Sequence, residues 1–460
     1  MKVFIKLICV LVGFCIMAGA LSSCGKIYKN KTPDYPSAQF EICGLWAPRE
    51  MSEEAFVQYK DAGFNVLSFT NHDEQPRSSE NQYYIGSKRT LEALKLCKKV
   101  GLDAYIAYGD SWFNRANEGD EYFDNKPFST YDYYQEYKDI IKGVHIKDEP
   151  NKENLPPYYS KELIADFKKV YPNAHYMINL IPQTAGSHIY GYETYSDLVS
   201  DYAKNIMSQF DTSYISLDFY PFHTIAITPD YYILENYELI AKTAKEYNGK
   251  KTFILQAGTG LEFEETLSEG DMRWQVYTAL GFGADNLQYY CYSVPEDREY
   301  NCCMLEPDNK TPSELYYYVK DLNYEIQSFA SVILSYDWDE TVGVSGSEET
   351  TYRVATLEMD ENFNKREFKK AKYLFSAQGS HDMIISRFES EQYGEGYMFV
   401  NFAARENANT ITATFKECDA VAIYGGKGYT GVPKVIELDE IGNVAINLEY
   451  GDGVFIIPLI

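Results

Sequence analysis

The sequence predicts an α/β protein: a (β/α)₈ TIM barrel followed by a C-terminal β-sandwich domain. At 460 residues the chain is too long for one ordinary domain. From about residue 40 to 334, segments with strand and helix patterns alternate eight times. From about residue 337 the helical period stops, and short apolar runs alternate with turn residues. We therefore expect a barrel over 37–336 and a β-sandwich over 337–460.

Each barrel unit has local signals of its own. Ser52 can cap a helix whose first turn carries Glu53 and Glu54, and Ser268 with Asp271 forms a capping box. The predicted strands are 40–46, 65–70, 102–108, 143–148, 174–182, 213–221, 251–258 and 285–293. The predicted helices are 52–63, 87–100, 131–141, 160–170, 195–209, 231–247, 268–281 and 311–334. Eight such units fit a barrel, which typically takes about 250 residues before insertions. No GxGxxG follows the first strand, which argues against a dinucleotide-binding fold.

The final part contains the strand-like runs "GYMFVNFAA", "AVAIYGG", "VAINLEY" and "GVFIIPLI", separated by Gly, Asn and Asp. The charged stretch 358–373 is expected to be an exposed loop.

The first residues have the pattern of an export signal. Lys2 and Lys6 precede an apolar run over 7–21, which is short for a membrane span. The sequence "LSSCG" around Cys24 then resembles a bacterial lipoprotein box. We expect a signal peptide over 1–24 with a lipid on Cys24, a polar tether over 25–36, and membrane anchoring on the extracytoplasmic face. An ordinary cleaved secretory signal is the alternative.

Composition limits the function classes. The formal net charge of −26 and a pI near 4.7 argue against nucleic acid as a partner and favour a neutral substrate. Aromatic residues form 16% of the chain, with 43 Tyr, which suits stacking on sugar rings or bases. Six cysteines lie outside the leader without a CxxC pair, so we expect buried thiols and no zinc site. No cofactor is expected.

The stretch "GVHIKDEPN" over 143–151 ends the fourth strand with Asp148 and Glu149. The carboxyl ends of the strands form the face where barrel enzymes place their active sites. A carboxylic acid there, walled by aromatic rings, can donate a proton to a leaving oxygen. Alternatively, Glu149 pairs with Arg49 or Lys147. Strand alternation places Lys147 and His145 on the side of Glu149, where His145 is expected to pack inside the barrel.

The segment "KDEPN" resembles the Asn-Glu-Pro motif of clan A glycoside hydrolases, retaining barrel enzymes that include the family 42 β-galactosidases. The resemblance implies that Glu149 is the general acid/base. Asp148 stands where the clan has an Asn that contacts the sugar. "DFYP" over 218–221 and the segment 272–292 are similar to the sixth strand and to the seventh helix and eighth strand of these barrels.

One departure from the clan is serious. Gln256 occupies the strand-seven position of the nucleophile glutamate, and an amide is neither nucleophile nor base. The usual strand-eight Trp is replaced by Tyr290 or Tyr292. The second carboxylate can come from elsewhere, from Asp218 or from Glu262, Glu264 or Glu265, and a distant acid would suit an inverting mechanism. Alternatively, the substrate supplies the nucleophile, or the barrel only binds sugar.

The sequence therefore predicts a surface-anchored protein that hydrolyses O-glycosidic bonds, with a glycan as substrate. The predicted catalytic residues are Glu149 and Asp218. The predicted sugar contacts are Asp148, Gln256, Trp46, Tyr220, Tyr292 and Asn179. A metal site made by His72, His223 and Asp218 has no support from spacing, and no metal is expected. The alternatives are a glycan-binding lipoprotein without catalysis and a structural surface protein that uses only its sandwich.

Overall fold

The computed structural model describes residues 32–460 except 47, 70–82, 84, 109–127, 131, 223–231, 261–266, 296–299 and 349–370. Eight parallel strands form one sheet in the order β1-β9-β7-β6-β5-β4-β3-β2. The strands are β1 (Glu41–Gly44), β2 (Val66–Ser68), β3 (Asp103–Ala107), β4 (Ile141–Asp148), β5 (His175–Leu180), β6 (Ser213–Phe219), β7 (Gly249–Gln256) and β9 (Asn286–Tyr290). This strand order confirms the predicted barrel.

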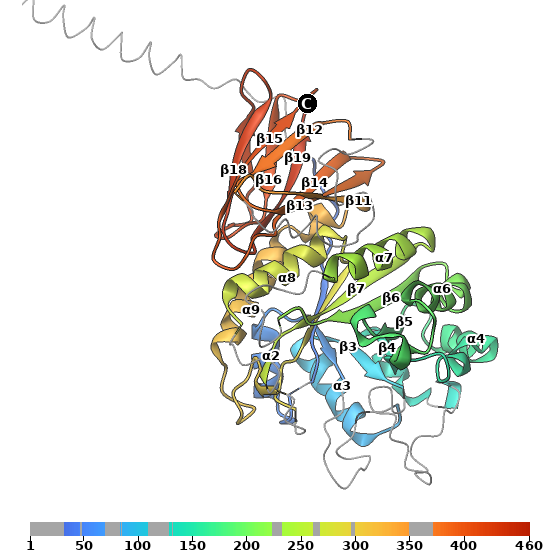
Figure 1. Ribbon diagram of the computed structural model, residues 1–460. Helices are drawn as coiled ribbons and strands as arrows, with labels where there is room; N and C mark the ends of the chain where they lie inside the picture. The colour runs from blue at the N-terminus through green and yellow to red at the C-terminus, as the bar shows by residue number, and fades with distance from the viewer. Residues whose placement is uncertain are drawn as a thin grey trace, which may run out of the picture.

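Helices cover the outside of this sheet (Figure 1). They are α2 (Glu53–Asp61), α3 (Lys88–Val100), α4 (Lys161–Val170), α5 (Ser187–Tyr190), α6 (Tyr195–Asn205), α7 (Ile233–Glu246), α8 (Glu269–Gly281), α9 (Glu314–Ser328) and α10 (Ala330–Ile333). Short 3₁₀ turns are η2 (Phe128–Thr130), η3 (Asp132–Tyr137), η4 (Pro156–Tyr159), η5 (Gln183–Ala185) and η6 (Met207–Gln209). No described helix is long and apolar enough to cross a bilayer.

Side chains close the barrel between β1 and β2. The Asn65 side chain accepts a hydrogen bond from the backbone N–H of Ile42 (2.8 Å), and the Asn65 backbone N–H donates to the Ile42 carbonyl (3.2 Å). The buried Tyr59 hydroxyl lies within hydrogen-bond distance of the Gly44 carbonyl (3.1 Å) and the Val66 carbonyl (2.8 Å). These bonds satisfy buried backbone groups at a seam where β1 and β2 form no regular ladder.

The C-terminal domain is a sandwich of two antiparallel sheets. One has the order β11-β13-β14-β19-β16-β17 and the other β12-β15-β18. The strands are β11 (Asp337–Val344), β12 (Leu374–Gly379), β13 (Met383–Ser390), β14 (Gly394–Asn401), β15 (Asn409–Phe415), β16 (Ala420–Tyr424), β17 (Lys434–Glu437), β18 (Asn443–Leu448) and β19 (Gly453–Leu459). Apolar side chains from both sheets, among them Phe399, Ile411 and Ile456, form one core. The predicted β-sandwich is confirmed.

Helix α8 lies between the barrel and the sandwich (Figure 1), and its residues from Asp271 onward are buried on every side. The Trp274 ring packs on Phe402, with ring centroids 4.8 Å apart. The buried Arg273 guanidinium pairs with Glu325 of α9 (2.7 Å) and with Asp452 of the sandwich (2.6 Å). This ion-pair triad and the aromatic contact join the two domains through one helix.

The structure differs locally from the predicted elements. The helix predicted over 131–141 is the 3₁₀ turn η3 in its described part, and β4 begins at Ile141. Tyr and Asp, which dominate this segment, have modest helix propensity. The helix predicted over 311–334 is divided at Phe329 into α9 and α10. A short antiparallel pair, β8 (Thr259–Gly260) with β10 (Tyr300–Cys302), was not predicted. Most of the predicted loop 358–373 lies outside the described residues.

Candidate active site

Glu149 and Asp218 lie at the same end of the barrel. Glu149 directly follows β4 and is exposed, whereas Asp218 stands near the end of β6 and is only 5% exposed. Both positions are at the carboxyl ends of parallel strands, the face that holds the active sites of barrel enzymes. The two residues predicted to be catalytic are therefore neighbours at the barrel mouth.

An irregularity in β4 turns Asp148 toward this site. His145 pairs with Met177, but the next paired residues are Lys147 with Ile178 and then Asp148 with Asn179. The extra residue in β4 is a β-bulge, which changes the side to which the following residues point. Asp148 consequently shares the face of Asn179, whereas uninterrupted alternation predicted Lys147 and His145 beside Glu149.

Asn179 links the acidic side chains. Its Nδ2 donates to Oδ1 of Asp148 (3.1 Å) and to Oδ1 of Asp218 (2.9 Å). Its Oδ1 accepts from the Ser216 hydroxyl (2.9 Å), which sets the orientation of the amide. Asn179 was predicted as a sugar contact, and the structure shows it holding the two carboxyl groups in place. Ser216 was not predicted, although β6 alternation places Ser216, Asp218 and Tyr220 on one face.

Glu149 and Asp218 form a hydrogen-bonded carboxyl pair. Burial raises the pKa of Asp218 to about 6, while hydrogen bonds from Asn179, Glu149 and Tyr220 act in the opposite direction. The hydrogen bond to Glu149 favours the ionised form of Asp218, as do those from Asn179 and Tyr220. The site thus places the exposed carboxyl group of Glu149 beside the buried carboxyl group of Asp218.

Asp148 adds a third carboxyl group. Burial, followed by the negative charge of Asp218, raises the pKa of Asp148 well above its usual range. The Asn179 amide and the Lys147 ammonium oppose this increase. Because Asp148 and Asp218 are close to each other and poorly solvated, the cluster retains protons at a pH where isolated aspartates are ionised.

Two residues at the mouth have a left-handed backbone. Glu149 has φ +41° and Trp46, just after β1, has φ +60°. This region disfavours side chains other than glycine and costs about 1–3 kcal/mol at each residue. Such backbone strain concentrates at functional sites, and here it affects the proposed acid and an aromatic neighbour of the site.

Aromatic rings form one wall of the mouth. Tyr220 and Tyr290 stack with centroids 5.6 Å apart and an interplanar angle of 17°. The Trp46 ring centroid lies 6.5 Å from that of Tyr290. Tyr220 is the most accessible of the three, and its hydroxyl also donates a hydrogen bond to Asp218. Its ring is therefore partly exposed while its hydroxyl group is held in place. Stacking on sugar was predicted for Trp46 and Tyr220 and remains a prediction.

Tyr292 has a different environment. It is fully buried, and its ring lies edge-on to Tyr59 (4.9 Å) and Phe64 (6.0 Å) in the packing between α2 and the barrel strands. The predicted contact of Tyr292 with sugar stays a prediction. Tyr290 is the aromatic residue at the end of β9 that belongs to the mouth.

Gln256 ends β7 and is also fully buried. Its Oε1 accepts from the backbone N–H of Phe222 (3.0 Å), and its Nε2 donates to the Phe222 carbonyl (3.1 Å). The backbone of Gln256 is in turn bonded to the Gln275 side chain of α8 (2.8 and 3.1 Å). The amide therefore ties the segment after β6 to β7, while its predicted contact with sugar stays a prediction.

The remaining candidate residues either form hydrogen bonds within the protein or lie outside the described residues. His145 is buried beside the Ser68 hydroxyl (3.0 Å), and burial lowers the pKa of His145 to about 3, so the ring is neutral. The Arg49 guanidinium donates to the Val294 carbonyl (2.8 Å). His72, His223, Glu262, Glu264 and Glu265 lie outside the described residues. Within the described part of the chain, no group of three or more His, Cys, Asp or Glu is arranged to hold a metal ion.

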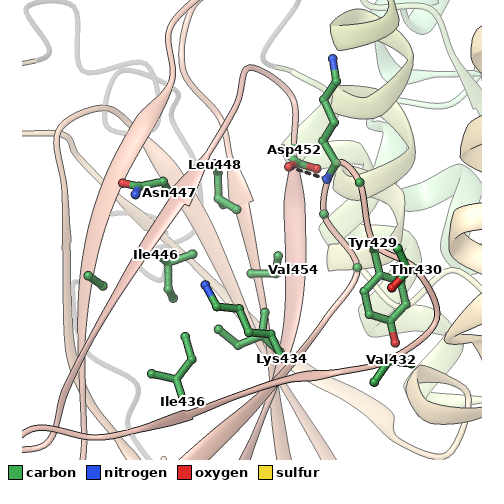
Figure 2. A pocket seen from close by; sticks show the side chains of 16 residues that line it. Tyr429, Thr430, Val432, Lys434, Ile436, Ile446, Asn447, Leu448, Asp452 and Val454 are labelled. Atoms are coloured by element: carbon green, nitrogen blue, oxygen red, sulfur yellow. Dashed lines mark hydrogen bonds between the residues drawn. The ribbon is translucent and has the colours of Figure 1, made fainter.

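A separate pocket of about 360 Å³ lies in the sandwich, between the 425–430 loop and strands β17 and β18 (Figure 2). Asp452 is its only acidic lining residue, and this side chain accepts from the Lys427 backbone N–H (2.9 Å) and pairs with Arg273. A pocket with one engaged carboxylate lacks the two acids that glycoside hydrolysis requires. The barrel mouth is therefore the candidate active site.

Comparison with known proteins shows distant structural similarity to TIM-barrel glycoside hydrolases. No family model and no curated protein matches the chain. Similar solved structures include a family 39 glycoside hydrolase from the gut symbiont Bacteroides cellulosilyticus, with 12% identity, coverage of 93% of this chain and 82% of that chain, and a TM-score of 0.48. A family 30 endoxylanase from Clostridium papyrosolvens has 11% identity, coverage of 93% and 98%, and a TM-score of 0.43. An exo-β-1,4-mannosidase from an Opitutaceae bacterium has 11% identity, coverage of 66% and 63%, and a TM-score of 0.42.

These similarities do not single out the family 42 enzymes that the sequence motifs resemble. The barrel assignment rests on the strand order and register of this chain.

Proposed function

We propose that this protein hydrolyses O-glycosidic bonds of a neutral glycan, with Glu149 as general acid and Asp218 as the second carboxylate. The observation that carries the proposal is the hydrogen-bonded pair of exposed Glu149 and buried Asp218 at the barrel mouth. Glycoside hydrolysis needs one protonated and one ionised carboxyl group. Above its pKa of about 6, Asp218 supplies the ionised group, and Glu149 is proposed to supply the proton.

Binding of substrate must open the pair. Carboxyl groups of retaining enzymes stand about 5–5.5 Å apart and those of inverting enzymes about 6.5–9.5 Å, and both separations exceed a hydrogen bond. Asp218 is held by Asn179 and Tyr220, whereas Glu149 is exposed at the end of its strand. The Glu149 side chain is therefore the one that moves. It leaves Asp218 and donates its own proton to the glycosidic oxygen.

Asp218 then faces the positive charge that develops on the sugar ring. As a buried carboxylate it stabilises an oxocarbenium-like transition state strongly, because the local dielectric constant is low. It acts either as the nucleophile or as the base for a water molecule. Tyr220 is proposed to stack on the sugar. Asp148, which stands where clan A enzymes have an Asn, is proposed to accept a hydrogen bond from a sugar hydroxyl.

We also propose that a lipid on Cys24 anchors the protein to the membrane on its extracytoplasmic face. The proposal rests on the leader sequence and the "LSSCG" motif. A Cys24→Ala variant is expected to move from the membrane fraction to the soluble fraction. Retention of this variant in the membrane would exclude Cys24 as the anchor.

The hydrolysis proposal is tested by release of reducing ends from a panel of neutral glycans. Wild type is compared with Glu149→Gln and with Glu153→Gln, a matched control at an exposed acid in the loop after β4. Loss of general acid catalysis is expected to lower the rate by about 10²–10⁴-fold in Glu149→Gln only. Equal rates for wild type and Glu149→Gln would remove Glu149 from the mechanism.

Glycan binding without hydrolysis is the second candidate function. Two observations favour it: Gln256 stands at the usual nucleophile position, and the two carboxyl groups touch each other. Calorimetry that shows sugar binding to wild type, together with no product from the same sugar after long incubation, would decide for this function.

A further inference from the structure

Two cysteine sulfurs meet behind the aromatic wall of the mouth. Cys291, directly after β9, and Cys303, directly after β10, have Sγ atoms 3.4 Å apart. Both side chains are fully buried, and they share a cluster with Trp46 and Tyr290. This separation is below the contact distance of two non-bonded sulfur atoms and exceeds the disulfide bond length of about 2.05 Å by little more than 1 Å.

The backbone already holds the two cysteines against each other. The Met304 N–H donates to the Cys291 carbonyl (3.4 Å), and the Leu305 N–H donates to the Tyr292 carbonyl (3.0 Å). The Ser313 hydroxyl binds the Cys303 carbonyl (2.7 Å) on the other side. These bonds align the two segments and hold the two sulfur atoms next to each other.

Neighbouring Cys302 is not the better partner. Its side chain is partly exposed, and its sulfur lies near the carboxyl group of Glu306 (3.9 Å). Adjacent cysteines such as Cys302 and Cys303 do not easily meet the separation that a disulfide requires. Within the described part of the chain, the thiol placed against that of Cys303 is therefore the thiol of Cys291.

We propose that Cys291 and Cys303 form a structural disulfide, which fixes the 300–305 segment to the end of β9 next to Tyr290. The bond forms by thiol–disulfide exchange with a small-molecule or protein disulfide. One cysteine thiolate attacks this oxidant and releases one thiol, and the second cysteine attacks the mixed disulfide and releases another. The two protein thiols are thereby oxidised, and one oxidant disulfide is reduced to two thiols.

The burial of both sulfurs determines when this exchange takes place. A fully buried thiol is closed to an oxidant, so the bond forms during folding, before the 300–305 segment covers β9. Export to an oxidising compartment, which the leader sequence predicts, supplies the oxidant. Once folded, the same burial protects the bond from reductants.

Peptide mapping of the exported chain tests this proposal. Accessible thiols are alkylated in denaturant without reduction, and the chain is then cut with trypsin. Arg273, Arg298 and Lys310 bound two peptides, 274–298 with Cys291 and 299–310 with Cys302 and Cys303. We expect a linked pair of these peptides that separates on reduction. The link should persist in Cys302→Ser and disappear in Cys303→Ser.

Complete alkylation of Cys291 in the exported chain, or a link that disappears in Cys302→Ser, would overturn the proposal. A second measurement uses wild type alone, which avoids variants that fail to fold. Wild type that is reduced in denaturant and refolded with reductant present is expected to have a Tm roughly 3–6 °C below that of the oxidised chain, as for a short closed loop. An identical Tm with and without reductant would also count against the disulfide.

Discussion

The raised pKa of Asp218 makes a quantitative prediction about stability. Folding changes this pKa from the ordinary value of 3.8 to about 6, with burial as the main cause. Below pH 4 the carboxyl group is protonated in both states and contributes nothing. Between pH 4 and 6 the unfolded chain releases the proton first, so the free energy of unfolding falls as pH rises. Above pH 6 the accumulated loss is about 3 kcal/mol, since one pKa unit corresponds to about 1.4 kcal/mol.

The Asp218→Asn variant is expected to remove this pH-dependent loss of unfolding free energy. An amide has no charge to bury, and its oxygen can still accept the Asn179 hydrogen bond. Relative to wild type, the variant should gain about 3 kcal/mol of unfolding free energy between pH 4 and pH 8. Urea unfolding at a series of pH values measures this gain. Asp211→Asn, at an exposed position just before the same strand, is the control and should show no such gain.

A difference between Asp218→Asn and wild type that stays constant from pH 4 to pH 8 would refute the reasoning. It would mean that Asp218 ionises in the folded protein as it does in water.

Three further predictions concern other parts of the site and the domain junction. Gln256→Glu should lower the free energy of unfolding by about 2–3 kcal/mol at neutral pH, because a buried carboxylate cannot donate a hydrogen bond to the Phe222 carbonyl. Urea unfolding should show a smaller loss at acidic pH, where the protonated side chain can donate again. Glu149→Gly should be about 1 kcal/mol more stable than Glu149→Ala by the same assay, because only glycine accepts φ +41° without strain, and equal stability would contradict the left-handed backbone. Arg273→Met leaves two buried carboxylates without their partner and should cost about 3–5 kcal/mol; limited proteolysis should then cut between barrel and sandwich, whereas unchanged resistance would show that the triad does not join the domains.

The barrel could be predicted because its signals are local. The Ser52 and Ser268 caps expected from the sequence accept hydrogen bonds from Ala55 and Asp271 in the structure, and Asp271 completes the predicted capping box. Each such signal needs only a few consecutive residues, and eight repeats of strand and helix then determine the architecture.

The arrangement of the site depends on contacts between distant residues, which the sequence pattern does not contain. Uninterrupted alternation along β4 does not place Asp148 beside Asn179, because the bulge that does so arises from the pairing of β4 with β5. The choice between Tyr290 and Tyr292 depends on where β9 ends, since Tyr292 already packs against α2. The engagement of Gln256 by Phe222 likewise requires the fold of the segment after β6.

The central claim is that the Glu149–Asp218 pair at the barrel mouth acts on a bound saccharide. The most direct measurement is a crystal structure of Glu149→Gln with a glycan that the wild type binds or cleaves. We expect the sugar to lie on the Tyr220 ring with a glycosidic oxygen against residue 149 and its ring carbon facing Asp218. A saccharide found only in the sandwich pocket, with the barrel mouth empty, would contradict the account.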